Sequence, residues 1–438
     1  MDNHRTIAVI GAGIGGMAAA YDLARAGHSV TIYESADYVG GLAAGFKEPG
    51  WDWSVERFYH HWFATDRHML GLIDELGWSS QVRFPRPYTV MYHQGKFYPF
   101  DSMFTNIPLF LLRHYPLADV IRFGLVGLYL RLTNNWQSLE KTTAEAWMRK
   151  YAGDHVYEVM WEPMMIGKFG ERYSRVVNMA WLWARLHART TRLGTFEGGF
   201  QAFADQFAAR LREMGVRICL SAPISRIAAH PEGGLALTTP EGQLHYDQVL
   251  VTTSPALLAR LAPDLPPDYL KGLLSLESMG AVVTILALKQ QLSREGYYWY
   301  NIPKTAGFPF LALVEHTNFL SPEYFGGDHI VYIGDYLEPD HEYFRLSQEE
   351  LLARFLPSLE RFNPDFKPDW VRKAWVFRTP YAQPVPRANH SRNIPAIQTP
   401  LPGLYFASMS QVYPWDRGTN FAVEIGRRAA RLMQAPPG

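Results

Sequence analysis

Cysteine is almost absent from this chain, since Cys219 is the only one among 438 residues. A single thiol excludes an intramolecular disulfide and a cysteine-based metal cluster, and it suits a reducing, cytoplasmic setting. Net charge is lacking too, because 42 basic and 42 acidic side chains cancel. No overall field attracts nucleic acid, so we expect no nucleic-acid partner.

Long apolar runs are also missing. No uninterrupted stretch approaches the roughly 20 residues that a membrane-spanning helix needs. Asp2, His4 and Arg5 near the N-terminus do not fit a signal peptide. No metal-ligand spacing stands out, and we expect no metal site. Aromatic residues are plentiful, with 13 Trp, 24 Tyr and 25 Phe. They suit an aromatic substrate cavity, and they suit an ordinary large core equally well.

Residues 5–34 form a strand–turn–helix–strand pattern that is typical of dinucleotide binding. Gly11, Gly13 and Gly16 give the GxGxxG spacing directly after an apolar strand. The first glycine permits a tight turn, the second lets the backbone approach a pyrophosphate, and the third lets the helix lie close to the strand. The helix N-terminus then faces the phosphates. A second strand ends at Glu34, whose carboxylate suits the ribose hydroxyls and disfavours NADP.

The rest of the chain alternates between helical and extended patterns. Apolar alternation around a His-Gln-Gly turn predicts a β-hairpin over residues 88–100. Residues 101–192 are mostly helical in pattern, and a helix is predicted over 200–214. Strands are predicted at 216–220, 224–229, 235–239, 248–252, 281–288, 329–333 and 403–407, and further helices at 68–76, 348–362 and 419–433.

Four segments together resemble the flavin-containing amine oxidase superfamily, which includes protoporphyrinogen oxidases and phytoene-type desaturases. They are the fingerprint at 11–34, the turn Gly40-Gly41-Leu42, the strands at 216–227 and 246–255, and the closing segment 403–430. UDP-galactopyranose mutases share the flavin-binding core. The resemblance implies an α/β fold: a Rossmann-like FAD-binding domain of a GR2-type flavoprotein with an inserted α+β substrate domain.

The resemblance also implies non-covalent FAD as cofactor, because Cys219 lies on a predicted strand far from the closing segment. In this family the residue matching Ile224 meets the adenine through its backbone, and the helix beginning at Thr419 points at the flavin ring. The expected FAD contacts are Gly11, Gly13, Ile14, Gly15, Gly16, Glu34, Ser35, Gly40, Gly41, Leu42, Ala43, Ile224, Thr253, Ser408, Met409, Thr419 and Asn420. The expected FAD-binding domain comprises 1–100, 193–280 and 385–438, and the substrate domain comprises 101–192 and 281–384.

The chain departs from the family pattern at three places. Ser408-Met409 stands where the family has Gly-Asp, and Leu42 stands where an arginine is common. Amine oxidases proper place a lysine near the flavin on a strand resembling 281–288, and no lysine precedes Lys289 there. Classical amine oxidation is therefore disfavoured. Because only one dinucleotide fingerprint is present, we expect electrons to leave to oxygen, a quinone or a protein partner.

Candidate catalytic residues are His60, His61 and Arg417. The histidines lie where the family's chain passes the flavin, and one of them can hydrogen-bond the ring or act as acid or base; a pair satisfied by backbone in a core is the alternative. Arg417 lies in the turn before the closing helix, and a surface turn is the alternative there. Candidate substrate residues are Arg185, Arg189, Arg378, Tyr413 and Trp415, the first two on a predicted helix face with Arg192.

Residues 117–132 are apolar nearly all round. They suit an opening for a lipid-like substrate at the inner face of a membrane, with peripheral contact, but we favour a buried core helix. Three functions follow. The favoured one is FAD-dependent desaturation or oxidation of a largely apolar or cyclic substrate by hydride transfer to flavin N5. The second is non-redox chemistry on a nucleotide- or lipid-linked sugar, as in the sugar mutases. The third is flavin carriage without turnover.

Overall fold

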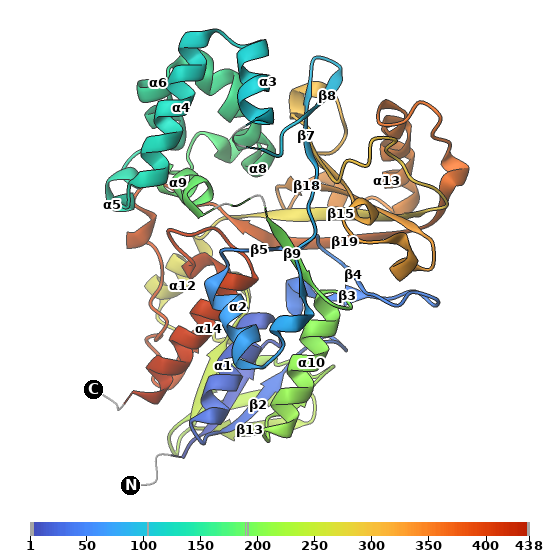
Figure 1. Ribbon diagram of the computed structural model, residues 1–438. Coiled ribbons are helices and arrows are strands. Elements are labelled where there is room, and N and C mark those ends of the chain that lie inside the picture. Colours follow the sequence, from blue (N-terminus) through green and yellow to red (C-terminus); the bar gives the residue numbers. More distant parts are fainter. Residues whose placement is uncertain (1–3, 103–104, 189, 191, 436–438) are drawn as a thin grey trace.

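The computed structural model describes residues 4–102, 105–188, 190 and 192–435. Arg189, one of the expected substrate residues, therefore lies outside the described residues. Two sheets and a helical part build the molecule (Figure 1), and both ends of the chain lie at the nucleotide-binding end.

The first sheet is a five-stranded parallel sheet with the order β10-β2-β1-β14-β20. β1 is joined to β2 through helix α1, the βαβ connection that parallel strands require. Its strands come from the two ends and the middle of the sequence: β1 Thr6–Ile10, β2 Ser29–Tyr33, β10 Arg217–Cys219, β14 Gln248–Val251 and β20 Leu404–Phe406. Helices α1 (Ile14–Arg25), α10 (Phe200–Glu213) and α14 (Thr419–Gln434) lie beside this sheet (Figure 1).

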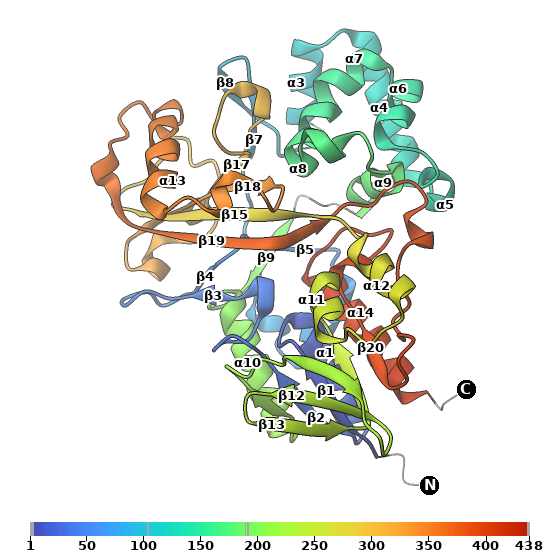
Figure 2. The same ribbon diagram turned by 180° about the vertical axis from the view of Figure 1, so that it is seen from behind.

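The second sheet has seven strands in the order β19-β15-β18-β17-β16-β7-β8. Its two longest strands, β15 and the edge strand β19, cross the middle of the molecule (Figure 2), and α13 (Gln348–Phe355) covers one end. The strands are β7 Thr89–His93, β8 Lys96–Pro99, β15 Ser278–Leu288, β16 Trp299–Asn301, β17 Ala312–Glu315, β18 His329–Leu337 and β19 Val371–Pro384.

A helical part built from residues 106–188 lies over one end of the second sheet (Figure 1). Its helices are α3 Asn106–His114, α4 Leu117–Leu132, α5 Trp136–Leu139, α6 Ala144–Ala152, α7 Asp154–Val156, α8 Glu162–Ser174 and α9 Met179–Ala188. A π-helical turn at Tyr157–Trp161 precedes α8, and Gly170 interrupts that helix with a φ of 65°. Helix irregularities of this kind are frequent at functional sites.

The remaining elements connect these parts. Short pairings link the loops beside the nucleotide sheet: β3 Gly45–Phe46 with β4 Val55–Glu56, and β5 Trp62–Phe63 and β6 Val82–Arg83 with β9 Leu193–Phe196. A three-stranded sheet consists of β11 Arg226–Ala229, β12 Leu235–Thr239 and β13 Gly242–Tyr246. The remaining α-helices are α2 Arg67–Glu75, α11 Pro255–Leu261 and α12 Pro267–Leu274.

Helices α1 and α14 cross at a pair of glycines. A Cβ added to Gly426 would lie 2.2 Å from the Gly15 carbonyl oxygen, and one added to Gly15 would lie 3.0 Å from the Ala422 carbonyl oxygen. Helix α1 also has buried alanines at 18–20, whose small side chains let neighbouring elements lie close to its backbone. This close crossing places the first turn of the C-terminal helix beside the first turn of the N-terminal one, although more than 400 residues separate them.

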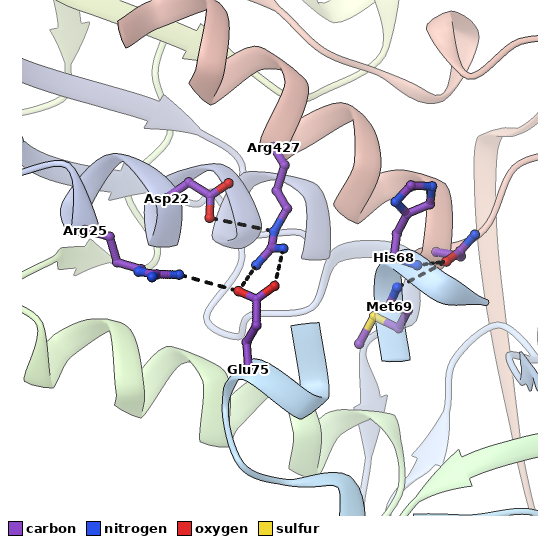
Figure 3. Close-up of polar contacts among 7 residues, drawn as sticks. Asp22, Arg25, His68, Met69, Glu75 and Arg427 are labelled. Atoms are coloured by element: carbon purple, nitrogen blue, oxygen red, sulfur yellow. Dashed lines mark hydrogen bonds and ion pairs between the residues drawn. The ribbon is translucent and has the colours of Figure 1, made fainter. Parts of the chain in front are cut away.

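An ion-pair network fixes a third helix to this pair (Figure 3). Arg427 of α14 donates from both terminal nitrogens to Glu75 of α2, each at 2.7 Å. Its Nε lies 3.7 Å from the Asp22 carboxylate of α1, and Arg25 of α1 also contacts Glu75 at 3.5 Å. The bidentate arginine holds the orientation of three helices at once.

The α/β fold with a Rossmann-like nucleotide-binding sheet is confirmed. The predicted strands and helices are found with their ends shifted by a few residues, except that the helix predicted over 348–362 ends at Phe355 and continues as a 3-10 helix over Leu356–Arg361. The hairpin of β7 and β8 pairs with β16 in the second sheet, so it does not join the nucleotide sheet as the segment 1–100 implied. We propose that residues 89–99 belong to the substrate domain, because β7 pairs with β16 of the second sheet.

We expect Gly426→Ala to destabilise the protein by several kcal/mol and to lower its FAD content, because the new methyl group would force the two helices apart. Gly272→Ala is the matched control: it also lies in a helix, and no atom lies within 4 Å of its added Cβ. That change should be neutral or stabilising by up to about 1 kcal/mol. Thermal unfolding and flavin absorbance measure both effects, and equal melting temperatures for the two variants would contradict the role of the crossing.

Candidate functional site

The GxGxxG turn has the geometry that a pyrophosphate site needs. Gly11 has a φ of 110°, and a Cβ there would lie 2.7 Å from Thr252 Oγ1. A Cβ on Gly16 would lie 2.1 Å from the Gly11 carbonyl oxygen, so helix α1 lies directly against the turn. Gly13 is the N-cap of α1 and provides no side-chain cap for the first amides, among them those of Ile14 and Gly15. Uncapped amides at a helix N-terminus can bind an anion such as a phosphate.

The second glycine turn lies against the first. Gly40 pairs with Gly13 in a parallel bridge, and a Cβ on Gly41 would lie 3.0 Å from Gly13 Cα. Leu42 and Ala43 follow in a short 3-10 turn. Glu34 ends β2 and accepts hydrogen bonds from the amides of Ala12 and Ala36, both at 2.9 Å. Ser35 also donates to this carboxylate, so three of its roughly four acceptor positions are used and one remains for a ribose hydroxyl.

Ser35, Ile224 and Thr253 border the same end of the sheet. Ser35 is exposed and donates its hydroxyl to Glu34 at 3.2 Å. Ile224 is half-buried in the extended segment before β11, and Thr253 is half-buried directly after β14. Nothing in these positions blocks an adenosine at the carboxyl ends of the parallel strands, where such sheets bind nucleotides.

The N-terminus of α14 lies at the other end of this region. Gly418 is its N-cap and provides no side-chain cap, which leaves the first amides of the helix for a ligand. Thr419 accepts a hydrogen bond from Trp62 Nε1 at 3.0 Å. Asn420 caps a different helix, because its Oδ1 accepts the amides of His68 and Met69 at the start of α2 (Figure 3). The two side chains therefore hold neighbouring segments, and their own amides stay uncapped.

Ser408 and Met409 replace the family's Gly-Asp with a small local structure. Ser408 is buried, its hydroxyl accepts the Ser410 amide at 3.3 Å, and its amide donates to Gln411 at 2.7 Å. Met409 is half-buried. No carboxylate replaces the family's aspartate at these two positions, so any cofactor contact here involves backbone groups or the serine hydroxyl.

The adjacent histidines point to opposite sides. His60 contacts Phe200 of the nucleotide unit, and its Nδ1 donates to the Phe58 carbonyl at 2.6 Å. Burial lowers the pKa of His60 to about 4; the Phe58 carbonyl opposes this shift and the Arg417 charge adds to it. His60 is thus neutral, with a lone pair on Nε2. His61 lies among the rings of Tyr59, Phe63 and Trp299.

Asp416 is the centre of a polar cluster that joins the closing turn to the helical part. It accepts hydrogen bonds from Arg185 at 2.6 Å, Trp181 at 3.1 Å and Gln383 at 3.2 Å. Burial opposes ionisation, but the charges of Arg185, Lys168 and Arg417 hold the pKa of Asp416 well below its usual range. Arg417 donates to Gln383 at 3.0 Å and to the Tyr336 hydroxyl. The turn is therefore an interior structure and not a surface turn.

The other expected substrate residues have structural partners. Tyr413 donates to Glu140 at 3.1 Å and accepts from Asn178 at 2.9 Å. Trp415 is stacked on Phe421 with ring centroids 5.7 Å apart. Arg378 donates to the backbone carbonyls of Tyr343 and Leu346 at 3.1 and 2.5 Å, so it ties a loop to β19. Its expected role as a substrate residue stays a prediction, since these two carbonyls engage only part of a guanidinium with five donors.

The expected arginine face is corrected. Arg185 is paired with Asp416, and α9 ends at Ala188, so helical spacing does not continue to Arg192. The Arg192 guanidinium lies 5.5 Å from the centre of the Phe84 ring instead. A helix end that sequence spacing did not reveal separates these side chains.

Sequence reasoning missed three residues near the site. Arg57 donates its amide to Ala44 beside the second glycine turn, and its guanidinium lies 3.8 Å from the centre of the Tyr38 ring. Lys168 of α8 lies 3.9 Å from the centre of the Tyr336 ring. Glu56 is buried, accepts the Phe200 amide at 3.1 Å and accepts the Tyr332 hydroxyl at 3.3 Å. The sequence held one signal for these residues, namely that Glu56 is an acidic residue inside an aromatic run.

Helix α4 is not the buried core helix that we favoured. Only Val126 and Leu130 are buried, whereas Leu117, Ile121, Leu125, Leu128 and Leu132 are 53 to 69% exposed. One side of the helix therefore packs on the helical part, and the other side faces outward although it is apolar. Within the described residues, no helix has the length and apolarity to cross a membrane, and no group of three or more His, Cys, Asp or Glu side chains is placed to hold a metal ion.

Burial raises the pKa of Glu56 to about 7, against the opposing hydrogen bonds from Phe200 and Tyr332. The folded protein binds this proton more tightly than the unfolded chain does. Its stabilising effect is present below the ordinary carboxyl pKa and is lost as pH rises to about 7.

Glu56→Gln should therefore gain stability relative to the wild type as pH rises from about 5 to about 8, because the variant has no charge to bury. Melting temperatures across this range measure the difference, with the exposed Glu232→Gln as control. A difference between Glu56→Gln and wild type that stays constant with pH would contradict a titrating buried carboxyl.

Comparison with known proteins shows where this fold and site belong. The model of the family "Flavin containing amine oxidoreductase" matches residues 14–434. The chain is 24% identical to horse amine oxidase [flavin-containing] A, over 97% of this chain and 84% of that protein. It is 22% identical to the 15-cis-phytoene desaturase of Synechococcus elongatus, over 85% and 84% of the two chains.

Solved structures share the fold at lower identity. A candidate protoporphyrinogen oxidase from Exiguobacterium sp. 255-15 superimposes with a TM-score of 0.77 at 19% identity, covering 98% of each chain. Cyclohexylamine oxidase from Brevibacterium oxydans superimposes with a TM-score of 0.71 at 16% identity, again covering 98% of each chain. The family match begins at the start of helix α1, directly after Gly13, and spans the second glycine turn and the closing helix. The chain therefore belongs to the flavin-containing amine oxidoreductase family, an oxidoreductase family whose cofactor is FAD.

Proposed function

We propose that this protein is an FAD-dependent oxidoreductase that desaturates or oxidises a largely apolar or cyclic substrate by hydride transfer to flavin N5. The observation that carries the proposal is the meeting of the uncapped α14 N-terminus with an aromatic, histidine-containing segment. Trp62 donates to Thr419 at 3.0 Å, and the preceding His61 lies among three aromatic rings. Rings around a single imidazole suit a hydrophobic substrate.

The residues present suit FAD along the whole length of the cofactor. The uncapped amides after Gly13 would hold the pyrophosphate, and Glu34 would hold the ribose of the adenosine half. Arg57 lies beside the second glycine turn and supplies the positive charge that Leu42 does not. The amides of Thr419 and Asn420 would stabilise negative charge on the flavin pyrimidine. FAD supplies hydride acceptance; the protein supplies position and electrostatics.

His60 and His61 would have different roles in the site. His60 is neutral and presents its Nε2 lone pair, so it would accept a hydrogen bond from the flavin or the substrate. His61 lies on the opposite side, towards Trp299 of the second sheet. It is the one we assign to the substrate. Electrons then leave to oxygen, a quinone or a protein partner, because the chain has one dinucleotide fingerprint.

The sugar-mutase alternative is not favoured. It relied on the histidine stretch, on the missing family aspartate and on an arginine face at residues 185, 189 and 192. Of these, the arginine face is weakened, because Arg185 is engaged by Asp416 and Arg192 lies beyond the end of α9. The family match is to oxidoreductases and their relatives.

Anaerobic mixing of the holoenzyme with hydrophobic donors, such as an isoprenoid polyene or a porphyrinogen, should bleach the yellow flavin absorbance. His61→Ala should slow the bleaching by roughly 10²-fold, a usual contribution of an acid–base group. The matched control is His4→Ala, which removes an exposed imidazole at the far end of the nucleotide sheet. No bleaching by any donor, together with isomerisation of a lipid-linked galactose by prereduced enzyme, would overturn the proposal.

We also propose that helices α3 and α4 rest on the surface of a lipid bilayer and thereby admit a lipophilic substrate. Thirteen large apolar side chains are exposed in the described part of the chain, and eight of them lie on these two helices. The α4 stripe continues onto α3 through Leu109 and Leu112, which are 65 and 54% exposed. The two helices are consecutive and lie at the end away from the chain termini (Figure 1).

The charged residues beside the α4 stripe favour a lipid surface as its partner over a second protein. Arg113, Arg122 and Arg131 flank the stripe and are exposed, whereas the acid within it, Asp119, is paired with His155 at 2.6 Å. Leucines beside exposed arginines are the composition of an interfacial helix, which binds anionic headgroups with its charges and acyl chains with its apolar face.

The wild type should sediment with vesicles of phosphatidylglycerol and phosphatidylcholine, and the triple change Ile121→Ser, Leu125→Ser, Leu128→Ser should abolish it. Each exposed aliphatic side chain gains about 1.5 to 3 kcal/mol on full burial. Leu274→Ser and Leu432→Ser remove leucines that are 62 and 45% exposed on other helices, and they should bind as wild type. A dimer in light scattering that the triple change dissociates, without vesicle binding, would assign the face to protein contact instead.

A further inference from the structure

Arg57 is a cation without an acidic partner beside the second glycine turn. It follows β4, and its amide donates to the Ala44 carbonyl, directly after that turn, at 2.9 Å. The side chain is half-buried, and its Nε is buried with no hydrogen-bond partner. Among the described residues, the guanidinium forms no ion pair and no hydrogen bond. Because a buried donor without an acceptor is costly, this group points to a ligand.

Two aromatic rings hold the guanidinium in place. Its central carbon lies 3.8 Å from the centre of the Tyr38 ring and 5.5 Å from the centre of the Phe377 ring. Tyr38 lies two residues before Gly40, whereas Phe377 belongs to β19 of the second sheet. Contact with a ring face positions an arginine and leaves the N–H groups in its plane for an acceptor. The guanidinium is therefore held beside the turn while its donors lack an acceptor.

The acids nearest to Arg57 in the sequence do not neutralise it. Glu56 is buried, and its two carboxylate oxygens accept hydrogen bonds from an amide and a tyrosine hydroxyl. Glu48 is paired with Lys373 at 2.7 Å. Asp37 is exposed and forms no ion pair with a described residue. The positive charge of Arg57 thus stays available to an anion.

The two glycine turns supply backbone groups but no charged side chain. Gly40 pairs with Gly13 in a parallel bridge, and the first amides of α1 have no side-chain cap. Residues 11–16 and 40–43 are all glycine, alanine, isoleucine or leucine. A helix N-terminus contributes the equivalent of about half a positive charge. The pyrophosphate of FAD is doubly negative, so the backbone alone leaves part of its charge without compensation.

We propose that Arg57 binds the pyrophosphate of FAD and is the side-chain cation of that site. The turn that Arg57 contacts lies against Gly13, where the uncapped amides begin. Guanidinium groups bind phosphate oxygens by charge-assisted hydrogen bonds, often with two donors at once. The inference concerns the cofactor alone, so it does not depend on the substrate proposed above.

Calorimetric titration of the full-length chain freed of FAD tests the proposal without turnover. The probes are ADP, AMP and adenosine, which share the adenosine half of FAD and differ in the number of phosphates. We expect Arg57→Gln to weaken ADP binding by about tenfold or more and to leave adenosine binding unchanged. Unchanged adenosine binding also shows that the variant is folded. AMP should be affected less than ADP, because it lacks the second phosphate.

Further variants assign the effect to the charge and to the ring that positions it. Arg57→Lys should restore ADP binding to within about fivefold of the wild type, because it keeps the charge and loses only the planar fork. Tyr38→Leu should weaken ADP binding by about threefold, whereas Tyr38→Phe should bind as wild type because it keeps the ring. The matched control is Arg212→Gln, which removes an exposed arginine at the end of α10.

An ADP affinity that Arg57→Gln does not change, or an equal loss for ADP and adenosine, would overturn the inference. If ADP binding is unchanged while the reduction potential of the bound flavin falls, the charge acts on the flavin ring and the assignment to the pyrophosphate is wrong. Failure of the proposed function has a different signature. If no hydrophobic donor reduces the flavin while ADP still binds through Arg57, the phosphate site stands and the proposed reaction falls.

Discussion

The close backbone approach between helix α1, its preceding turn and helix α14 is the constraint on which the site depends. Gly16 lets α1 lie against the Gly11 carbonyl, and Gly15 and Gly426 let α14 lie against α1. A Cβ at Gly16 or Gly426 would lie 2.1 or 2.2 Å from a backbone oxygen, so a side chain at either position would force the elements apart. Because the helices cross near their first turns, two uncapped, positively polarised helix ends come to one region, and the cofactor has negative charge to place at each.

The chemistry of the site depends on how few charges the interior tolerates. His60 stays neutral because burial outweighs its hydrogen bond to Phe58, and Asp416 stays ionised because three cations surround it. Glu56 lies between these cases, since it has hydrogen bonds but no ion pair. The same physical rule therefore gives three protonation behaviours within one site, and the position of each partner decides which.

The helical part contributes both to the site and to the surface of the molecule. Its inner side brings Lys168 and Arg185 to the closing turn, and its outer side exposes the leucine stripe of α4. The break at Gly170 and the π-helical turn before α8 let one irregular helix reach the site from this part.

The sequence by itself determined the elements and the nucleotide-binding unit. Periodicity of two and of 3.6 is a local property, and the glycine turns and Glu34 lie within one βαβ unit, so short-range chemistry was enough to predict them. The closing helix and the two histidines were also within reach, through a resemblance that rests on contiguous motifs.

Only the tertiary structure decided which side chains meet. Arg185 and Arg378 have the residue type of a substrate ligand, yet Asp416 and two backbone carbonyls engage them. Lys168 and Arg57 reach the site from segments that have no motif. The sequence of helix α4 fits a core and a membrane surface equally well, because composition does not reveal which neighbours a helix has. Burial and pairing between distant segments are properties of the folded chain, and they set both the charge of the site and the surface that the protein exposes.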